Sequence, residues 1–134
     1  MTYLLDTDIC IDYLRGSNPV VRDRLLACSP ADLCLSSVVK AELLFGAHNS
    51  QQVAANLRRL NDFFEPFQSV SFDDGAAEVY GSLRSHLRRE GLEIGSNDLM
   101  IASTAVALGL TLVTRNRGEF DRVPGLRVTE WKAN

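Results

Sequence analysis

The stretch Tyr3-Leu4-Leu5-Asp6-Thr7-Asp8 decides the fold of this chain. It is a short apolar run that ends abruptly in acidic residues, which is typical of a buried parallel strand delivering a carboxylate to the end of a sheet. Ligands of open α/β sheets bind at that end. An aspartate after a strand often does no more than cap the next helix, so Asp6 indicates a cation site only if other acidic residues converge on it.

The length and composition indicate one soluble globular domain. With 134 residues, 46% of them hydrophobic and 23% charged, residues 1–134 can form a single domain with a real core. No apolar run reaches the ~18 residues of a membrane span and no signal peptide precedes the first strand, so we expect a cytoplasmic protein without membrane association. The three cysteines form no C-x-x-C pair, which predicts free buried thiols.

The order of predicted elements indicates the fold class. Apolar periodicity and capping residues predict alternating strands and helices, with helices over 9–14, 19–27, 38–47, 51–64, 74–89 and 99–109, and strands over 3–5, 33–35, 70–72, 111–114 and 126–128. This alternation predicts a three-layer α/β/α sandwich around a mainly parallel central sheet. Right-handed crossovers place the carboxyl ends of the strands on one edge, which receives Asp6, the Ser36-Ser37 turn and Thr114-Arg115-Asn116.

Glu42 is a candidate site residue because of its position on the helix over 38–47. An ionised carboxylate on an apolar helix face is costly unless it is paired or binds a metal, and Lys40 projects from a different face. The residues that share its face are Val38, Val39, Phe45 and Gly46. A partly exposed Glu42 near one end of the helix is the simpler alternative.

Asp98 opens a helix that is too apolar to lie on the surface. A favourable interaction with the helix dipole explains an aspartate there equally well. However, a buried helix start near the strand ends would bring Asp98 towards Asp6 and Glu42. Three such carboxylates repel one another unless a cation neutralises them, and ligation by oxygen alone suits Mg²⁺ or Mn²⁺. Hydrolysis of phosphodiesters is the natural chemistry of such a site.

Four motifs together resemble the PIN-domain ribonucleases, and among them the VapC toxins of bacterial toxin–antitoxin pairs. The resemblance runs from about residue 3 to Trp131. The motifs are Leu4-Leu5-Asp6-Thr7-Asp8, Val39-Lys40-Ala41-Glu42-Leu43-Leu44-Phe45-Gly46, Ile94-Gly95-Ser96-Asn97-Asp98-Leu99-Met100-Ile101-Ala102 and Leu112-Val113-Thr114-Arg115-Asn116, followed by Phe120 and Val123-Pro124-Gly125-Leu126. Each motif is short, but their order and spacing are specific.

The resemblance implies roles for individual residues. Asp6, Glu42 and Asp98 match the family's three acidic positions, with Asp6 and Asp98 as direct Mg²⁺ ligands. Asn116 falls where many relatives carry a fourth acid, so Glu119 is a candidate for the missing charge. Asp8 is expected to support the site by orienting carboxylates or metal-bound water.

The resemblance also implies a homodimer, cleavage of structured RNA such as the anticodon loop of initiator tRNA, and inhibition by a VapB-type antitoxin. Apolar side chains in 38–47 and 51–64 could form the antitoxin groove or simply pack the two helices together. A basic set could follow an RNA backbone, although a solvated helix face explains most of it equally well; the set is Arg84, His86, Arg88, Arg89, Arg115 and Arg117.

Two other functions fit parts of the sequence. Asp6 and Asp8 resemble the Asp-x-Asp of haloacid-dehalogenase-like phosphatases, with Asp6 as nucleophile and Asp8 as acid. Such an enzyme also needs a lysine to hold the phosphoryl group, and the chain has only Lys40 and Lys132. The remaining alternative is an RNA- or protein-binding module in which the acidic residues are structural.

Overall fold

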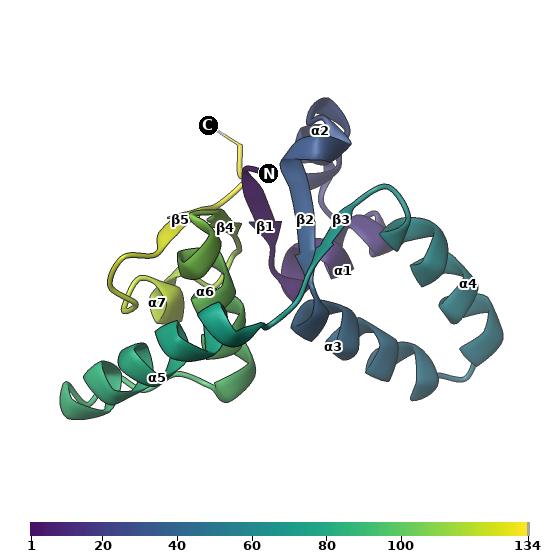
Figure 1. Cartoon of the computed structure of the whole chain (residues 1–134). Coiled ribbons are helices and arrows are strands. Elements are labelled where there is room, and N and C mark those ends of the chain that lie inside the picture. The colour runs from purple at the N-terminus through teal and green to yellow at the C-terminus, as the bar shows by residue number, and fades with distance from the viewer. Residues whose placement is uncertain (134) are drawn as a thin grey trace.

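Five parallel strands form the centre of the molecule in the computed structural model, which describes residues 1–133 (Figure 1). The strands lie in the order β3-β2-β1-β4-β5. They are β1 (Tyr3–Leu5), β2 (Leu33–Ser36), β3 (Gln68–Val70), β4 (Thr111–Val113) and β5 (Arg127–Thr129). All four residues of β2 are buried, as expected for a parallel strand covered on both sides.

Seven α-helices and one 3₁₀ turn connect the strands of the described chain. They are α1 (Thr7–Arg15), α2 (Pro19–Ala27), η1 (Pro30–Asp32), α3 (Ser37–His48), α4 (Val53–Phe64), α5 (Asp74–Arg89), α6 (Ser96–Leu108) and α7 (Arg117–Phe120). Most begin where the sequence predicts. For example, the side chain of Asn18 accepts a hydrogen bond from the Val21 N–H ahead of Pro19, and Gly16 ends α1 in the left-handed conformation with φ of 65°.

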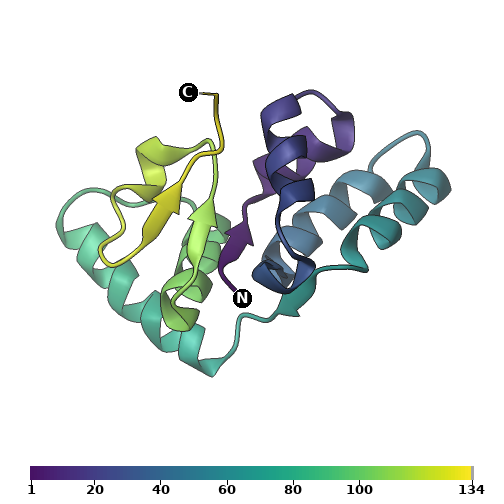
Figure 2. The same ribbon diagram turned by 90° about the horizontal axis from the view of Figure 1, so that it is seen from above.

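The helices lie on both faces of the sheet, which confirms the α/β sandwich. Seen from above, α1 and α2 lie on one side of the strands, and α5 and α6 lie on the other (Figure 2). Helices α3 and α4 pack against each other and extend away from the sheet beyond α1 (Figures 1 and 2). Since α5 and α6 also pack together, each face carries a pair of helices rather than isolated ones.

The direction in which the chain adds strands to the sheet reverses between β1 and β4. From β1 the chain moves outward to β2 and then β3, and it returns across the other face to β4 and β5. β1 pairs with β4 in a register that aligns Leu5 with Val113, so that Asp6 and Thr114 end these strands side by side. Such a switch point, at the carboxyl ends of parallel strands, is where open α/β sheets bind ligands.

Two local predictions were wrong. β3 covers 68–70 rather than 70–72, because its pairing with β2 aligns Gln68 with Cys34 and Val70 with Ser36. Phe72 lies beyond this strand and packs edge-on against Tyr80, with 5.8 Å between the ring centroids. The helix predicted over 99–109 begins earlier, at Ser96, and Gly95 stands at its N-cap without a side-chain bond. Asp98 therefore lies inside the helix.

The core is continuous across the sheet and includes the fully buried Leu4, Leu35 and Leu112 from three adjacent strands. All three cysteines are free, as predicted, and Cys10 and Cys34 are buried, but Cys28 is only partly buried, contrary to the prediction. In the described chain, no helix is both long enough and apolar enough to cross a membrane.

We predict that Leu4→Ala lowers the free energy of unfolding by about 2–5 kcal/mol, because it leaves a cavity at the centre of the sheet. The matched control is Leu26→Ala on α2, whose leucine is 66% exposed whereas Leu4 is fully buried. The control is expected to change stability by less than about 0.5 kcal/mol. Urea denaturation followed by circular dichroism measures both; equal losses would contradict this placement of the core.

Candidate active site

Asp6 stands where β1 ends and α1 begins, and its side chain is held by two donors. Its Oδ1 accepts the Thr7 backbone N–H at 2.9 Å, and its Oδ2 accepts the Thr114 hydroxyl at 2.7 Å. The residue is only 6% exposed. Asp6 is therefore both the cap of α1 and a buried carboxylate at the strand end, which confirms the capping interpretation, while cation binding stays a prediction.

The surroundings of Asp6 disfavour its ionised form. Burial raises the pKa of Asp6 to about 6, and the negative charges of Asp8 and, to a smaller extent, Glu42 act in the same direction. The hydrogen bonds from Thr114 and Thr7 lower this pKa and so offset part of the rise. A bound cation would relieve this repulsion.

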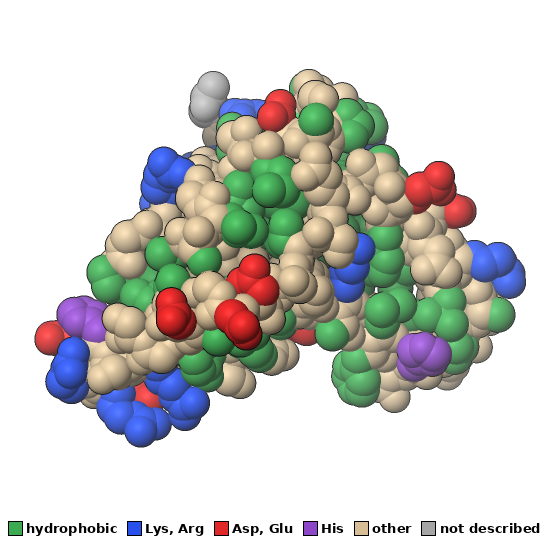
Figure 3. All heavy atoms as spheres, in the orientation of Figure 1, with side chains coloured by type: hydrophobic (Ala, Val, Ile, Leu, Met, Phe, Trp, Pro, Cys, Tyr) green, Lys and Arg blue, Asp and Glu red, His purple; other side chains and the backbone are tan. Residues whose placement is uncertain are grey.

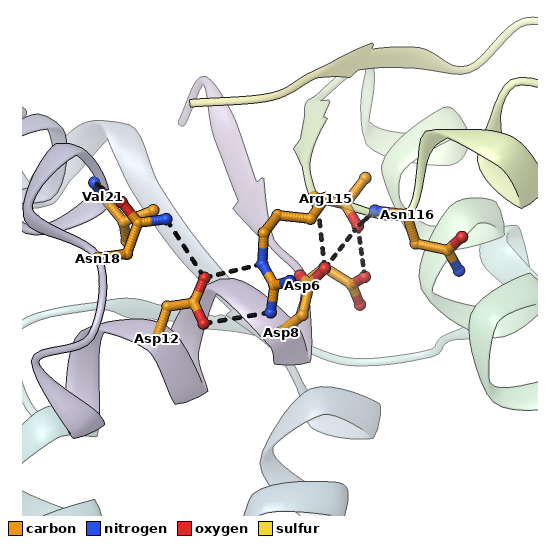
Figure 4. A network of polar contacts seen from close by, with 8 residues as sticks. Asp6, Asp8, Asp12, Asn18, Val21, Arg115 and Asn116 are labelled. Atoms are coloured by element: carbon orange, nitrogen blue, oxygen red, sulfur yellow. Dashed lines mark hydrogen bonds and ion pairs between the residues drawn. The ribbon is translucent and has the colours of Figure 1, made fainter. Parts of the chain in front are cut away.

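Asp8 is fixed by the segment that follows β4 (Figure 4). Its Oδ2 accepts the Arg115 backbone N–H at 2.9 Å and lies 3.4 Å from the Thr114 hydroxyl. Its Oδ1 is buried and has no hydrogen-bond partner in the described part of the chain. Burial raises the pKa of Asp8, whereas the hydrogen bond from the Arg115 backbone and the positive charge of Arg115 lower it in part. Asp8 thus holds the loop after β4 and carries one carboxylate oxygen without a donor, whereas its predicted role in orienting metal-bound water stays a prediction.

Glu42 reaches the site from α3. The Thr7 hydroxyl donates to its Oε1 at 2.9 Å, although the two residues are 35 positions apart. The only nearby lysine in sequence, Lys40, lies over the Phe64 ring instead, 5.1 Å from its centroid. Glu42 therefore has a hydroxyl partner and, among residues 1–133, no salt bridge.

Asp98 enters from the first turn of α6 and meets Glu119 of α7. The pKa of Asp98 is raised to about 7, mainly because the side chain is buried. A hydrogen bond with the Glu119 carboxyl group contributes next, followed by the negative charges of Asp6, Glu119 and Glu42. The charges of Asp6, Glu42 and Asp98 therefore act on one another, as expected for residues that converge, and Glu119, the candidate for the missing charge, lies beside Asp98.

Asn116 lies at the rim of this group. Its backbone N–H donates to the Thr114 hydroxyl at 3.0 Å, and its amide group donates to Glu119 Oε2 at 3.4 Å. Asn116 has no carboxylate of its own, and it is Glu119 that supplies a fourth carboxylate beside Asp98.

The hydroxyl groups of Thr7 and Thr114 were not predicted to hold site carboxylates, although Thr114 was expected at the same sheet edge as Asp6. Both hydroxyls orient site carboxylates, Thr7 that of Glu42 and Thr114 that of Asp6. A signal for Thr114 was present, because it ends the strand predicted over 111–114, at the sheet edge that also receives Asp6. Only the pairing of β1 with β4 puts the two side by side.

The donor set fits a hard divalent cation. Within residues 1–133, no three acidic, histidine or cysteine side chains form a ready-made metal cluster, and both oxygens of Asp6 already accept hydrogen bonds. Mg²⁺ usually takes only one or two protein carboxylates and keeps several waters. Converging carboxylates with raised pKa values, and the unpaired Oδ1 of Asp8, suit such an ion.

Three arginines of the predicted basic set form ion pairs with acidic residues of this chain. Arg88 pairs with Glu93 at 3.0 Å, Arg117 with Asp121 at 3.3 Å and Arg115 with Asp12 at 2.8 Å. Basic side chains gather at the far end of α5, at the lower left of Figure 3, where an open depression is lined by Gly81, Arg84, Ser85, Arg88 and Arg89. Contact of this set with RNA stays a prediction.

We predict that Asp6→Asn stabilises the metal-free protein at pH 8. Because folding raises the pKa of Asp6 from 3.8 to about 6, its contribution to stability is present below about pH 4 and is lost as the pH rises through about 6. Removing the charge should therefore add about 1–2 kcal/mol at pH 8 in a chelator and nothing near pH 4.

Urea unfolding at the two pH values, with and without Mg²⁺, measures this effect. The control is Asp121→Asn, because Asp121 is an exposed carboxylate that pairs with Arg117; this variant should show no such pH dependence. Added Mg²⁺ should stabilise the wild type more than Asp6→Asn. A loss of stability in the variant at pH 8 would mean that the Asp6 hydrogen bonds outweigh its burial.

Comparison with proteins of known sequence gives relatives along nearly the whole chain. The chain is 37% identical over 131 residues to the tRNA(fMet)-specific endonuclease VapC of Shigella flexneri, with 98% of each chain covered. It is 38% identical over 133 residues to ribonuclease VapC2 of Rickettsia felis, again covering 98% of each.

Solved structures give the same relationship. The chain matches VapBC2 from Rickettsia felis bound to a DNA fragment from their promoter with a TM-score of 0.92 and 35% identity, covering 98% of this chain and 100% of the other. It matches DNA-bound VapBC from Salmonella typhimurium with a TM-score of 0.93 and 33% identity, covering 98% and 99%. The PIN domain model matches residues 3–126. With its carboxylates at the switch point of an all-parallel sheet, this chain belongs to the PIN domain family.

Proposed function

We propose that this chain is a divalent-metal-dependent endoribonuclease and the toxin of a VapBC-type toxin–antitoxin pair. The observation that carries the proposal is the convergence of Asp6, Glu42, Asp98 and Glu119, in which Asp6 and Asp98 have pKa values of about 6 and 7. Membership of the PIN domain family and relatives named as ribonucleases support the same chemistry.

In this proposal Asp6 and Asp98 hold Mg²⁺ directly, and Mn²⁺ can replace it. A bound divalent ion supplies an activated water and stabilises the charge that develops on the phosphoryl oxygens. Thr114 fixes the Asp6 carboxylate, and Thr7 fixes that of Glu42. Glu42 and Asn116 complete the catalytic set by holding water, and Glu119 would share a proton with Asp98.

The proposed substrate is structured RNA. One relative is named as specific for tRNA(fMet), and on that basis the anticodon loop of initiator tRNA is the first RNA to test. The enzyme would act in the cytoplasm, where such RNA is found, and as a homodimer.

The proposed antitoxin site is the hollow between α1, α3 and α4. Its volume is about 270 Å³, and it is lined by Ile11, Leu14, Arg15, Glu42, Leu43, Gly46, Ala47, Asn56, Arg59 and Leu60. Leu43 and Leu60 are at most 7% exposed, so internal packing of α3 on α4 uses part of the apolar surface that the sequence suggested for a partner. A peptide in this hollow would still contact Glu42 and so reach the catalytic group.

The phosphatase alternative finds little support in the geometry. Asp8 accepts the Arg115 backbone N–H, which suits a fixed carboxylate rather than a mobile proton donor. Of the two lysines, Lys40 lies over the Phe64 ring and Lys132 follows the last strand. The binding-module alternative is decided by the activity measurement below.

We predict that Asp6→Asn and Asp98→Asn each lower RNA cleavage at least about 100-fold while the protein stays folded, because each removes a proposed metal ligand. Glu119→Gln should lower it about tenfold or more, and Asn116→Ala by less than Glu119→Gln, because Glu119 and not Asn116 contacts Asp98. Asp121→Asn should cleave like the wild type.

Cleavage is measured with antitoxin-free protein, initiator tRNA and total RNA, in Mg²⁺, in Mn²⁺ and in a chelator, and the new RNA ends are sequenced. If the wild type cleaves no RNA with either ion, or if Asp6→Asn stays active, the ribonuclease proposal fails. Asp8→Asn should weaken cleavage only partly; a complete loss with phosphatase activity in the wild type would favour the dehalogenase-like alternative.

A further inference from the structure

The guanidinium group of Arg115 links the segment after β4, which carries Asn116, to α1, which carries Asp12. Its Nε lies 2.8 Å from Asp12 Oδ2, and a terminal nitrogen donates to Asp12 Oδ1 at 3.2 Å (Figure 4). This is the forked geometry in which arginine binds a carboxylate most specifically. The Asp12 side chain is 12% exposed and that of Arg115 is 50% exposed, so the contact is sheltered on one side only.

The same residue is attached to α1 a second time through its backbone. Asp8 accepts the Arg115 N–H, and Asp8 and Asp12 are four residues apart on α1 and so share one helix face. Two like charges at that spacing destabilise a helix, and the positive charge of Arg115 offsets this repulsion. Asn18, the N-cap residue of α2, also donates to Asp12 Oδ2, at 3.5 Å.

The segment held in this way leads directly to Asp98. Asn116 follows Arg115, its amide group donates to Glu119, and Glu119 lies close enough to Asp98 to raise the pKa of that carboxyl group. A continuous series of contacts therefore joins Asp12 on α1 to Asp98 on α6, passing through the loop after β4.

We propose that Asp12 and Arg115 form a clamp that positions Asn116 and Glu119 against Asp98. Arg115 is then a positioning residue rather than a contact for RNA phosphate, because Asp12 already occupies its fork. The clamp rests on the proposed ribonuclease function for its effect on catalysis, but its effect on the loop does not depend on that function.

The first test is a double-mutant cycle on RNA cleavage with Asp12→Asn, Arg115→Met and the double variant. Each single variant should lower kcat about five- to tenfold with KM within about twofold, and the double variant should be no worse than the poorer single one. Asp121→Asn, which removes the exposed partner of Arg117, is the matched control and should match the wild type.

The alternative role gives the opposite pattern. If Arg115 binds RNA phosphate, Asp12→Asn frees its guanidinium and leaves RNA binding unchanged or tighter, while Arg115→Met raises KM and lowers the salt slope by about 1. That pattern, or additive losses in the double variant, would overturn the clamp.

The second test needs no catalysis. If Arg115 acted only through its positive charge, Arg115→Met would tighten Mn²⁺ binding, because a cation would be removed beside the site. Calorimetry measures this binding. The clamp predicts weaker Mn²⁺ binding, by about fivefold, and faster hydrogen exchange of the 115–119 amides in both single variants. Tighter Mn²⁺ binding with unchanged exchange would overturn the proposal.

The two proposals can fail separately. If the wild type cleaves no RNA while Arg115→Met loosens the 115–119 segment and weakens Mn²⁺ binding, the ribonuclease function fails and the clamp stands. If the wild type cleaves RNA and the cycle is additive, the clamp alone fails. Arg115→Lys keeps the charge but loses the fork, so it serves if Arg115→Met does not fold, and the clamp predicts the same direction of change for it.

Discussion

The crowding of carboxylates beside the end of β1 is the constraint on which the rest of the structure depends. Asp6 is buried and close enough to Asp8, Glu42 and Asp98 that their charges raise pKa values across the group. Such an arrangement lowers the stability of the metal-free protein at neutral pH. It is tolerated because a large apolar core, continuous across the sheet, stabilises the fold elsewhere.

The donors that hold the acidic residues are nearly all uncharged. Thr7 and Thr114 offer hydroxyl groups, and the backbone N–H groups of Thr7 and Arg115 complete the set. Hydroxyl and amide donors orient a carboxylate without cancelling its charge. The guanidinium group of Arg115, which follows Thr114, is bound by Asp12, so it does not cancel the negative potential that attracts a divalent cation.

The proposed partner site and the proposed catalytic site meet at Glu42. This residue lines the hollow between α1, α3 and α4, and its carboxylate is bonded to Thr7 at the start of α1. A protein segment in that hollow and an RNA strand at the carboxylates would therefore compete for the same edge. This geometry offers a physical basis for inhibition by direct contact with a catalytic group.

The sequence by itself determined the alternation of strands and helices, the family, and the three acidic residues that come together. These features follow from local patterns, such as the apolar run that ends at Asp6, the Asn18-Pro19 helix start and Glu42 on an apolar face. The tertiary structure alone decided which side chain meets which. Thr7 bonds Glu42 from 35 positions away and Arg115 bonds Asp12 from 103 positions away, and Glu119 rather than Asn116 reaches Asp98. Such contacts depend on strand register and on how helices pack across the sheet, and local sequence encodes neither of them.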